Sequence, residues 1–350
     1  MSDDRPLTRK TRRRLDRAAR DRLIAEIAAA APDEYPPARR DDIDLSEEAA
    51  EITSDDAGTV ELGEAAQPLD PEGTTPAEPS RESPRESDRQ DQDTAPPAPS
   101  AEPLPMPGRS WPRLASIPVD AGHLERNLII TATRHDPAHG AFDVLRTRLV
   151  RTLAEHDWKR VAITSPTRDC GKTFTAVNLA ISLSRYETHR TILMDMDMRN
   201  PSVATVLGVD DPGSIGNFLR GRTGVTEAFK RLGRNALNIG TNLAVAMNER
   251  VESYAAELLQ APETAIALSR MMDELDPDIV LYDLPPALAF DDVIAFKDHF
   301  DGILMIIGGG QTRPDEVHEA MRRIGEDVPL LGVVLNQAEA DDAMAYSYGY

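Results

Sequence analysis

Short apolar runs alternate with amphipathic stretches from about residue 126 onward. The runs are rich in Val, Ile and Leu, which is typical of strands buried on both faces of a parallel sheet. Between them, apolar residues recur at helical spacing. This order predicts an α/β fold in which helices cover both faces of a mainly parallel sheet. Strands are predicted at Leu128–Ala132, Arg160–Ser165, Thr191–Asp195, Asp278–Asp283, Gly302–Ile307 and Leu330–Asn336, and helices at Ala138–Glu155, Lys172–Arg185, Tyr254–Glu274 and Pro314–Ile324.

The first 112 residues follow a different pattern. Residues 8–31 carry apolar side chains at spacing four under an Arg-rich surface, so residues 1–32 are predicted to form a basic amphipathic helix. This helix is interpreted either as a docking segment for anionic lipid or a partner, or as a solvated basic arm. No Phe, Tyr or Trp occurs between Tyr35 and Trp111, and a stretch of this composition cannot build a core. The predicted organisation is a helix at 1–32, a disordered acidic Pro-rich linker at 33–112, a folded domain at 113–337 and a flexible tyrosine-bearing tail at 338–350.

Charge is concentrated in the predicted linker. Residues 41–93 carry 18 Asp and Glu against three Arg. Their net charge is −15, and the net charge of the whole chain is −21. The rest of the chain therefore carries only −6, and it lacks the basic surface that general nucleic-acid binding requires. We expect no nucleic-acid partner.

The single cysteine and the hydropathy pattern favour a cytoplasmic location for the protein. A single cysteine, Cys170, excludes an internal disulfide framework and suits a reducing compartment. The longest apolar run, Gly302–Gly310, is far shorter than the roughly 18 residues that span a bilayer. We expect a cytoplasmic protein whose contact with a membrane is peripheral or through a partner.

A phosphate-binding loop is predicted between the second strand and the helix that follows it. Backbone N–H groups and the positive end of a helix dipole can hold phosphate oxygens there. The loop ends in Gly-Lys-Thr, where Lys172 would reach the β and γ oxygens and the Thr173 hydroxyl would ligate Mg²⁺. Gly-Lys-Thr alone is a weak signal, because Pro166 stands where the Walker A pattern has its first glycine. The candidate nucleotide-binding residues are Asp169, Cys170, Gly171, Lys172, Thr173 and Phe174, with Cys170 best explained as a small residue that fills the loop.

Acidic residues follow two further predicted strands. Asp195 and Asp197 leave the end of one strand two positions apart, and Asp283 ends another before Pro285 and Pro286. The carboxyl ends of parallel strands share one edge of a sheet, so these carboxylates are expected near the phosphate loop. Each aspartate alone is best explained as a turn former or helix cap. Together with Gly-Lys-Thr they predict a Mg²⁺ and phosphoryl-transfer site, with Lys172, Asp195, Asp197 and Asp283 as the catalytic candidates.

These motifs resemble the bacterial tyrosine kinases of capsule and exopolysaccharide assembly, a branch of the ParA/MinD-like P-loop ATPases. Thr164–Ala180 is similar to the family's Walker A segment, Ile192–Pro201 to its Walker A′, and Ile279–Asp292 to its Walker B and the following loop. Gly302–Arg313, Leu331–Asn336 and the tyrosine-bearing C-terminus are similar as well. The order and spacing of three motifs make the resemblance more specific than any one of them.

The resemblance implies a tyrosine autokinase that regulates polysaccharide polymerisation and export. It implies that Lys172 and Thr173 hold ATP and Mg²⁺, that Asp283 and one of Asp195 and Asp197 support the metal, and that the other aspartate activates the acceptor hydroxyl. The metal candidates are thus Thr173, Asp195 and Asp283, and the phosphoacceptors Tyr346, Tyr348 and Tyr350. The implied partner is a membrane-bound polysaccharide co-polymerase that controls chain length and activates the kinase, so localisation peripheral to the inner membrane is expected. A homo-oligomer is also compatible with the resemblance.

The chain departs from the family pattern at two places. Arg168 and Asp169 stand where the family usually has Pro-Gly, and Arg146 is the one member kept of a Glu, Arg, Arg pattern that resembles the ring-forming contact. These departures leave an alternative in which the protein is an ATP-binding regulator with little or no kinase activity. A ParA/MinD positioning ATPase is a further alternative. It should carry a second loop lysine, at a position that resembles Thr167 here.

Overall fold

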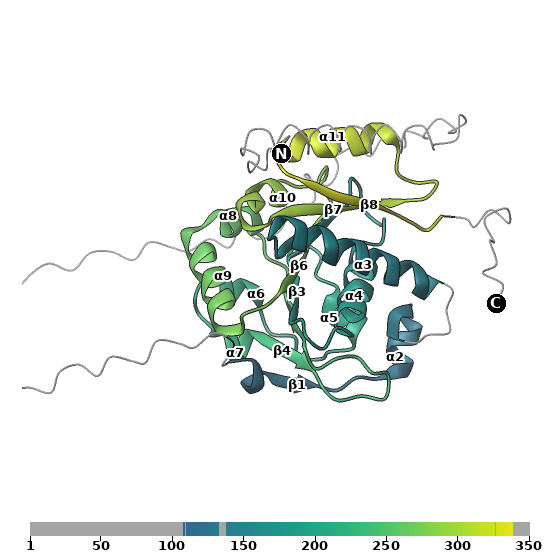
Figure 1. Cartoon of the computed structure of the whole chain (residues 1–350). Coiled ribbons are helices and arrows are strands. Elements are labelled where there is room, and N and C mark those ends of the chain that lie inside the picture. Colours follow the sequence, from purple (N-terminus) through teal and green to yellow (C-terminus); the bar gives the residue numbers. More distant parts are fainter. Residues whose placement is uncertain (1–107, 109, 133–137, 326, 339–350) are drawn as a thin grey trace, which may run out of the picture. The chain divides into compact units, whose positions relative to one another are not determined.

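The computed structural model of the chain describes residues 108, 110–132, 138–325 and 327–338. In this part of the chain, eight strands form one sheet in the order β1-β4-β5-β3-β6-β2-β7-β8. The strands at the two ends of this order, β1 and β8, lie on opposite sides of the domain in Figure 1. Only the β4–β5 pair is antiparallel among these strands. The predicted mainly parallel α/β fold is confirmed. The strands are β1 (Ala115–Ile117), β2 (Arg160–Thr164), β3 (Thr191–Asp195), β4 (Phe229–Leu232), β5 (Leu243–Ala246), β6 (Ile279–Asp283), β7 (Gly302–Gly308) and β8 (Leu330–Asn336).

Helices cover both faces of this sheet (Figure 1). Alternate strand residues point to opposite faces, so Leu193 joins one core cluster while Ile192 and Met194 join the other. The helices that pack with Leu193 are α2 (Ala121–Arg126), α3 (Ala138–His156), α4 (Lys172–Leu183) and α5 (Val203–Leu207). Those on the other face are α6 (Ile215–Leu219), α7 (Val225–Ala228), α8 (Ala255–Gln260), α9 (Pro262–Leu275), α10 (Asp292–Ala295) and α11 (Pro314–Ile324).

Three short 3₁₀ helices complete the described elements: η1 (Trp111–Arg113), η2 (Ile130–Ala132) and η3 (Lys297–His299). Trp111 is buried, and its indole N–H donates to the Thr241 carbonyl at 3.2 Å. The predicted N-terminal helix, the predicted linker as far as residue 107, and the C-terminal tail from residue 339 lie outside the described residues. None of the described helices is long and apolar enough to cross a membrane.

The strand predicted at Leu128–Ala132 is wrong. Leu128 has a φ of 57°, and η2 follows it. The Asn178 side chain on α4 accepts the Thr131 backbone N–H at 3.0 Å, and Arg185 donates to the Thr131 carbonyl. Side chains of α4 and of Arg185 just beyond it thus take the backbone groups that a strand would use for a ladder. An apolar run of this length cannot distinguish a strand from a buried turn.

Other elements differ from the prediction in number or length. The helix predicted at Tyr254–Glu274 is two helices, α8 and α9, because Pro262 disfavours a helical conformation at Ala261. Strands β1, β4 and β5 were not predicted. They have three or four residues each, which is too short for a clear alternation of apolar and polar positions.

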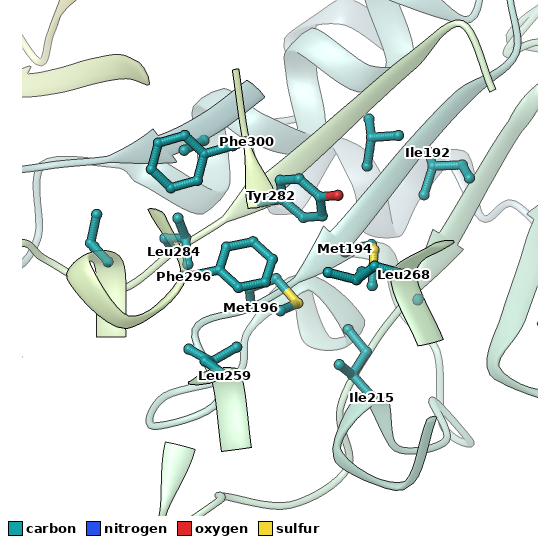
Figure 2. Packing of buried hydrophobic residues seen from close by; sticks show 14 of the residues in the cluster. Ile192, Met194, Met196, Ile215, Leu259, Leu268, Tyr282, Leu284, Phe296 and Phe300 are labelled. Carbon is teal, nitrogen blue, oxygen red and sulfur yellow. The ribbon is translucent and has the colours of Figure 1, made fainter. Parts of the chain in front are cut away.

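An aromatic cluster fills the core between β6 and the helices on its face. The Phe296 ring lies edge-on to Tyr282, with 4.9 Å between ring centroids and an interplanar angle of 82°, and Phe300 lies beside it (Figure 2). Phe296 and Tyr282 are both buried. This cluster packs beneath the strand that ends at Asp283, so it helps to fix that strand's position.

Replacing Phe296 with Ala is expected to lower the free energy of unfolding by about 3–5 kcal/mol, because it removes a buried ring and leaves a cavity beside Tyr282. Ile266→Ala is the control, since Ile266 is 67% exposed on α9. Its effect should stay within about 0.5 kcal/mol. Urea unfolding followed by circular dichroism measures both. Equal losses in the two variants would show that the ring does not support this core.

Candidate nucleotide and metal site

Two carboxylates lie side by side at the carboxyl edge of the sheet. Asp195 ends β3, Asp283 ends β6, and the parallel register pairs these two residues directly. Both are fully buried. The sequence expectation that separate strands bring these aspartates to one edge agrees with this arrangement.

The loop before α4 lies beside them, after β2. Gly171 caps α4 with a φ of 83°, and a Cβ at this position would collide with the Asn336 amide. The side chain of Asn336 donates to the Cys170 carbonyl at 3.0 Å, which connects the loop to the end of β8. Glycine is therefore required at 171 both for the backbone conformation and for the close approach of β8.

Lys172 and Thr173 open α4 and face the carboxylates. The Lys172 ammonium lies 3.8 Å from an oxygen of Asp197. The Thr173 hydroxyl donates to Asp283 at 2.6 Å and accepts from the Ser202 hydroxyl at 2.9 Å. The structure thus brings five of the predicted site residues together: Lys172, Thr173, Asp195, Asp197 and Asp283.

The three carboxylates differ in their surroundings. One Asp195 oxygen accepts the backbone N–H groups of Ser202 and Val203, each at 3.0 Å. Burial raises the pKa of Asp195 well above its usual range, and the nearby Asp283 carboxylate raises it further. Burial also raises the pKa of Asp283 to about 7, although Lys172 opposes that rise.

Asp197 is the aspartate nearest to the lysine. Burial raises its pKa, while the Lys172 charge opposes the rise. The Asn200 backbone N–H donates to one of its oxygens at 3.1 Å. Asp197 is slightly exposed, at 5%, whereas Asp195 and Asp283 are at 0%. Of the three carboxylates it is thus the one closest to solvent and to the Lys172 ammonium.

The residues present fit a magnesium ion bound together with a nucleotide. One oxygen of Asp195 and one of Asp283 are buried without a hydrogen-bond partner in the described structure. With the Thr173 hydroxyl they form an oxygen donor set of the kind that Mg²⁺ prefers. Within the described residues, no group of three His, Cys, Asp or Glu side chains is arranged to hold a metal by itself. Mg²⁺ usually has few protein ligands and completes its coordination shell with phosphate oxygens and water.

The other loop residues surround this centre. Asp169 is exposed in the left-handed region, with a φ of 63°. Cys170 is fully buried, and its sulfur lies 3.4 Å from the Thr312 hydroxyl. Phe174 packs edge-on to Phe142, with 6.0 Å between the ring centroids. Among the predicted nucleotide-binding residues, Cys170 therefore packs the loop and Phe174 packs the helix against α3.

Two residues of the site were missed from the sequence. Ser202 contacts both Thr173 and Asp195, and Asn248 donates to the Asp195 carbonyl at 2.9 Å. Ser202 follows directly after the Walker A′ similarity, so an extension by one residue would have included it. Asn248 follows β5, a strand that was not predicted. The predicted phosphoacceptors Tyr346, Tyr348 and Tyr350 lie outside the described residues.

Comparison with known proteins identifies the class that this fold and site define. Residues 161–347, more than half of the chain, match the CobQ/CobB/MinD/ParA nucleotide binding domain family. The chain belongs to this family of nucleotide-binding domains, as the resemblance implied.

Its similar relatives include tyrosine kinases. The chain is 25% identical over 232 residues to the tyrosine-protein kinase YwqD of Bacillus subtilis, covering 64% of this chain and 92% of YwqD. It is 26% identical over 229 residues to the tyrosine-protein kinase etk of Escherichia coli K12, covering 65% of this chain and only 30% of etk. The solved kinase domain of Escherichia coli ETK has the same fold, with a TM-score of 0.55 at 24% identity, covering 67% of this chain and 94% of that domain. The similarity to bacterial tyrosine kinases predicted from the motifs is confirmed.

Replacing Asp283 with Asn is expected to stabilise the protein in the absence of nucleotide and Mg²⁺. The pKa of Asp283 is about 7 in the folded protein against a model-compound value of 3.8, so the folded state binds the proton more tightly than the unfolded state. The stability that this group contributes is present below pH 4 and is lost as the pH rises toward and past 7. The unfolding temperature of Asp283→Asn should therefore exceed that of the wild type by a few degrees at pH 8, and the difference should shrink at pH 5.

Asp273→Asn is the matched control, because Asp273 is an exposed aspartate on α9. It should leave the unfolding temperature nearly unchanged at both pH values. A lower unfolding temperature for Asp283→Asn at pH 8 would contradict the view that the Asp283 carboxylate is held at a cost in stability.

Proposed function

We propose that the chain is an ATP- and Mg²⁺-dependent protein-tyrosine kinase that phosphorylates its own tyrosines and regulates capsule or exopolysaccharide assembly. The observation that carries the proposal is the convergence of Lys172, Thr173 and three aspartates at the carboxyl edge of the sheet. Phosphoryl transfer depends mainly on positioning and on neutralising charge, and these groups provide both. The tyrosine kinases among the similar proteins support this reaction over a role as a non-catalytic regulator.

The contacts suggest a division of roles. Lys172 is placed to hold phosphate oxygens, since it extends from the first position of α4 beside the loop. Thr173, Asp283 and Asp195 would hold Mg²⁺, which when bound neutralises charge on the phosphates. Asp195 suits this role because one of its oxygens is held by two backbone N–H groups while the other lacks a partner.

Asp197 is then the group best placed to accept the proton of an acceptor hydroxyl. It is the least buried of the three carboxylates and lies 3.8 Å from Lys172. Burial moves its pKa upward, toward the range in which a carboxylate is an effective general base at neutral pH. Tyr346, Tyr348 and Tyr350 are the proposed acceptors. Transfer converts each hydroxyl to a phosphate monoester, with ADP as the leaving group.

The cellular setting follows from the resemblance alone. We propose that the protein is cytoplasmic and reaches the inner membrane through a polysaccharide co-polymerase, a membrane protein that controls chain length and activates the kinase. Assembly into a homo-oligomer would let one copy phosphorylate another.

Replacing Lys172 with Ala should abolish nucleotide binding without unfolding the domain, because the ammonium contributes charge to phosphate rather than packing. Titration with a fluorescent ATP analogue, alongside a thermal melt, measures both effects. Lys159→Ala is the control, a lysine of the same domain whose ammonium contacts the Pro277 carbonyl at 3.2 Å. Tight binding by Lys172→Ala would refute the phosphate assignment.

Each of Asp195→Asn, Asp197→Asn and Asp283→Asn should lower the rate of autophosphorylation by more than about tenfold, since each removes a charge next to the reacting groups. Phosphotyrosine is measured by mass spectrometry after incubation with ATP and Mg²⁺. If the Asp197 assignment is right, Asp197→Asn should retain nucleotide binding in the presence of Mg²⁺ while losing transfer. Absence of phosphotyrosine in a wild-type sample that binds ATP would overturn the kinase proposal.

A further inference from the structure

A second pocket opens at the same edge of the sheet, beside the end of β5. It is a cavity of about 540 Å³ between α6 and the loop that follows β5. Arg220, Arg222, Arg250, Glu249, Glu252 and Asn248 are among its lining residues. We refer to it as the arginine pocket. None of the roles proposed above uses its arginines.

The pocket has a positive charge that its own acids do not neutralise. Arg220 pairs with Glu252 at 2.8 Å. The Arg250 guanidinium lies 3.9 Å from a carboxylate oxygen of Glu249, and both side chains are largely exposed. Arg222 has no ion pair within 4.0 Å among the described residues and is exposed at the pocket. Three arginines against two glutamates leave the pocket with a net positive charge and one unpaired guanidinium, which suits a carboxylate ligand.

Backbone and side-chain hydrogen bonds connect this pocket to the proposed catalytic centre. Asn248 lines the pocket and donates to the Asp195 carbonyl at 2.9 Å. The Glu252 backbone N–H donates to the Met198 carbonyl at 2.8 Å. A chain segment held in the pocket would therefore lie next to the loop that carries Asp195 and Asp197.

The sequence contains a segment with the matching charge. Glu339, Asp341 and Asp342 follow the last described residue, Ala338, and residues 338–350 contain no Lys or Arg. These acids precede Tyr346, Tyr348 and Tyr350, and three residues separate Asp342 from Tyr346. We propose that the arginine pocket binds this acidic segment of the C-terminal tail and thereby selects the acceptor tyrosines. The inference rests on the proposed kinase function.

The tail begins beside the phosphate loop. The Gln337 side chain donates to the Asp169 carbonyl at 3.1 Å, and a Cβ at Gly309, the residue after β7, would collide with the Ala338 backbone. Ala338, the last described residue before the acids, therefore lies at the same edge of the sheet as the pocket.

The spacing between neighbouring strands allows a tyrosine of the tail to reach the carboxylates. The strands that carry Asp195 and Asp283 are the first and second neighbours of β5, at ~5 and ~10 Å. Tyr346 is four residues beyond Asp342, so an extended segment covers up to ~14 Å between them. The acids can therefore occupy the pocket while the hydroxyl of Tyr346 lies at the catalytic centre.

Binding of a labelled peptide to the full chain tests the inference. The peptide corresponds to residues 337–350, and fluorescence anisotropy gives its dissociation constant. We expect the peptide with Glu339→Gln, Asp341→Asn and Asp342→Asn to bind about tenfold more weakly, because it loses the charge-assisted contacts. The protein variant Arg222→Ala/Arg250→Ala should bind the unchanged peptide more weakly by a similar factor, and it should not distinguish the two peptides.

The matched control is Arg151→Ala/Arg322→Ala, which removes two exposed arginines from α3 and α11. This variant should bind the peptide like the wild type. The inference is overturned if the wild type does not bind the peptide, if Arg222→Ala/Arg250→Ala binds it as tightly as the wild type, or if the control variant loses as much affinity. Thermal melts ensure that each variant is folded.

The readout is independent of phosphoryl transfer, so the two proposals can fail separately. A wild-type protein that binds the peptide but does not phosphorylate it refutes the kinase and supports the pocket. Phosphorylation of the peptide with equal half-saturating concentrations for the wild type and Arg222→Ala/Arg250→Ala refutes the pocket and supports the kinase.

Discussion

The register that pairs Asp195 with Asp283 on adjacent parallel strands is the constraint on which the site depends. It holds two carboxylates next to each other in a buried position, where like charges repel and desolvation disfavours ionisation. The surrounding structure only partly offsets this cost, through the Ser202 and Val203 backbone N–H groups, the Thr173 hydroxyl and the Lys172 charge. A bound cation would supply the remaining compensation. The strain between the carboxylates is therefore a source of affinity for Mg²⁺ rather than a defect of the fold.

The backbone conformation of Asp169 and the contacts of Arg168 explain how the phosphate loop accommodates these two unusual residues. Asp169 has a left-handed backbone conformation, which explains why the family that this chain resembles usually has glycine at this position. Aspartate is one of the few other residues that tolerate this conformation. Arg168 is exposed, and its guanidinium lies 5.6 Å from the centre of the Phe290 ring, which Arg199 also approaches at 4.6 Å. The Arg168 charge also acts on Asp197, where it opposes the rise in pKa. The negative charge that Asp169 brings to the loop is thus accompanied by a positive charge on the preceding residue, Arg168.

The sequence was informative where a strand is long and buried on both faces. Strands β2, β3, β6, β7 and β8 show continuous apolar runs, so their positions and the aspartates at their ends could be predicted. Strand β5 has four residues, Leu243–Ala246, and nothing in its local pattern distinguishes it from a buried loop. Missing β5 meant missing Asn248 and the pocket beside it. The strand predicted at Leu128–Ala132 is wrong for a different reason. Its backbone groups bond to Asn178 and Arg185, two side chains that lie far along the chain and that a local pattern does not reveal.

The parallel sheet also fixes distances between functional groups that are remote in sequence. The functional groups follow strands that end at one edge of the sheet. The arginine pocket lies at the end of β5, the two buried carboxylates end β3 and β6, the phosphate loop follows β2, and the tail follows β8. Strand spacing therefore sets the separations along this edge. The carboxylates lie between the pocket and the phosphate loop, as a site that joins a peptide to a nucleotide requires.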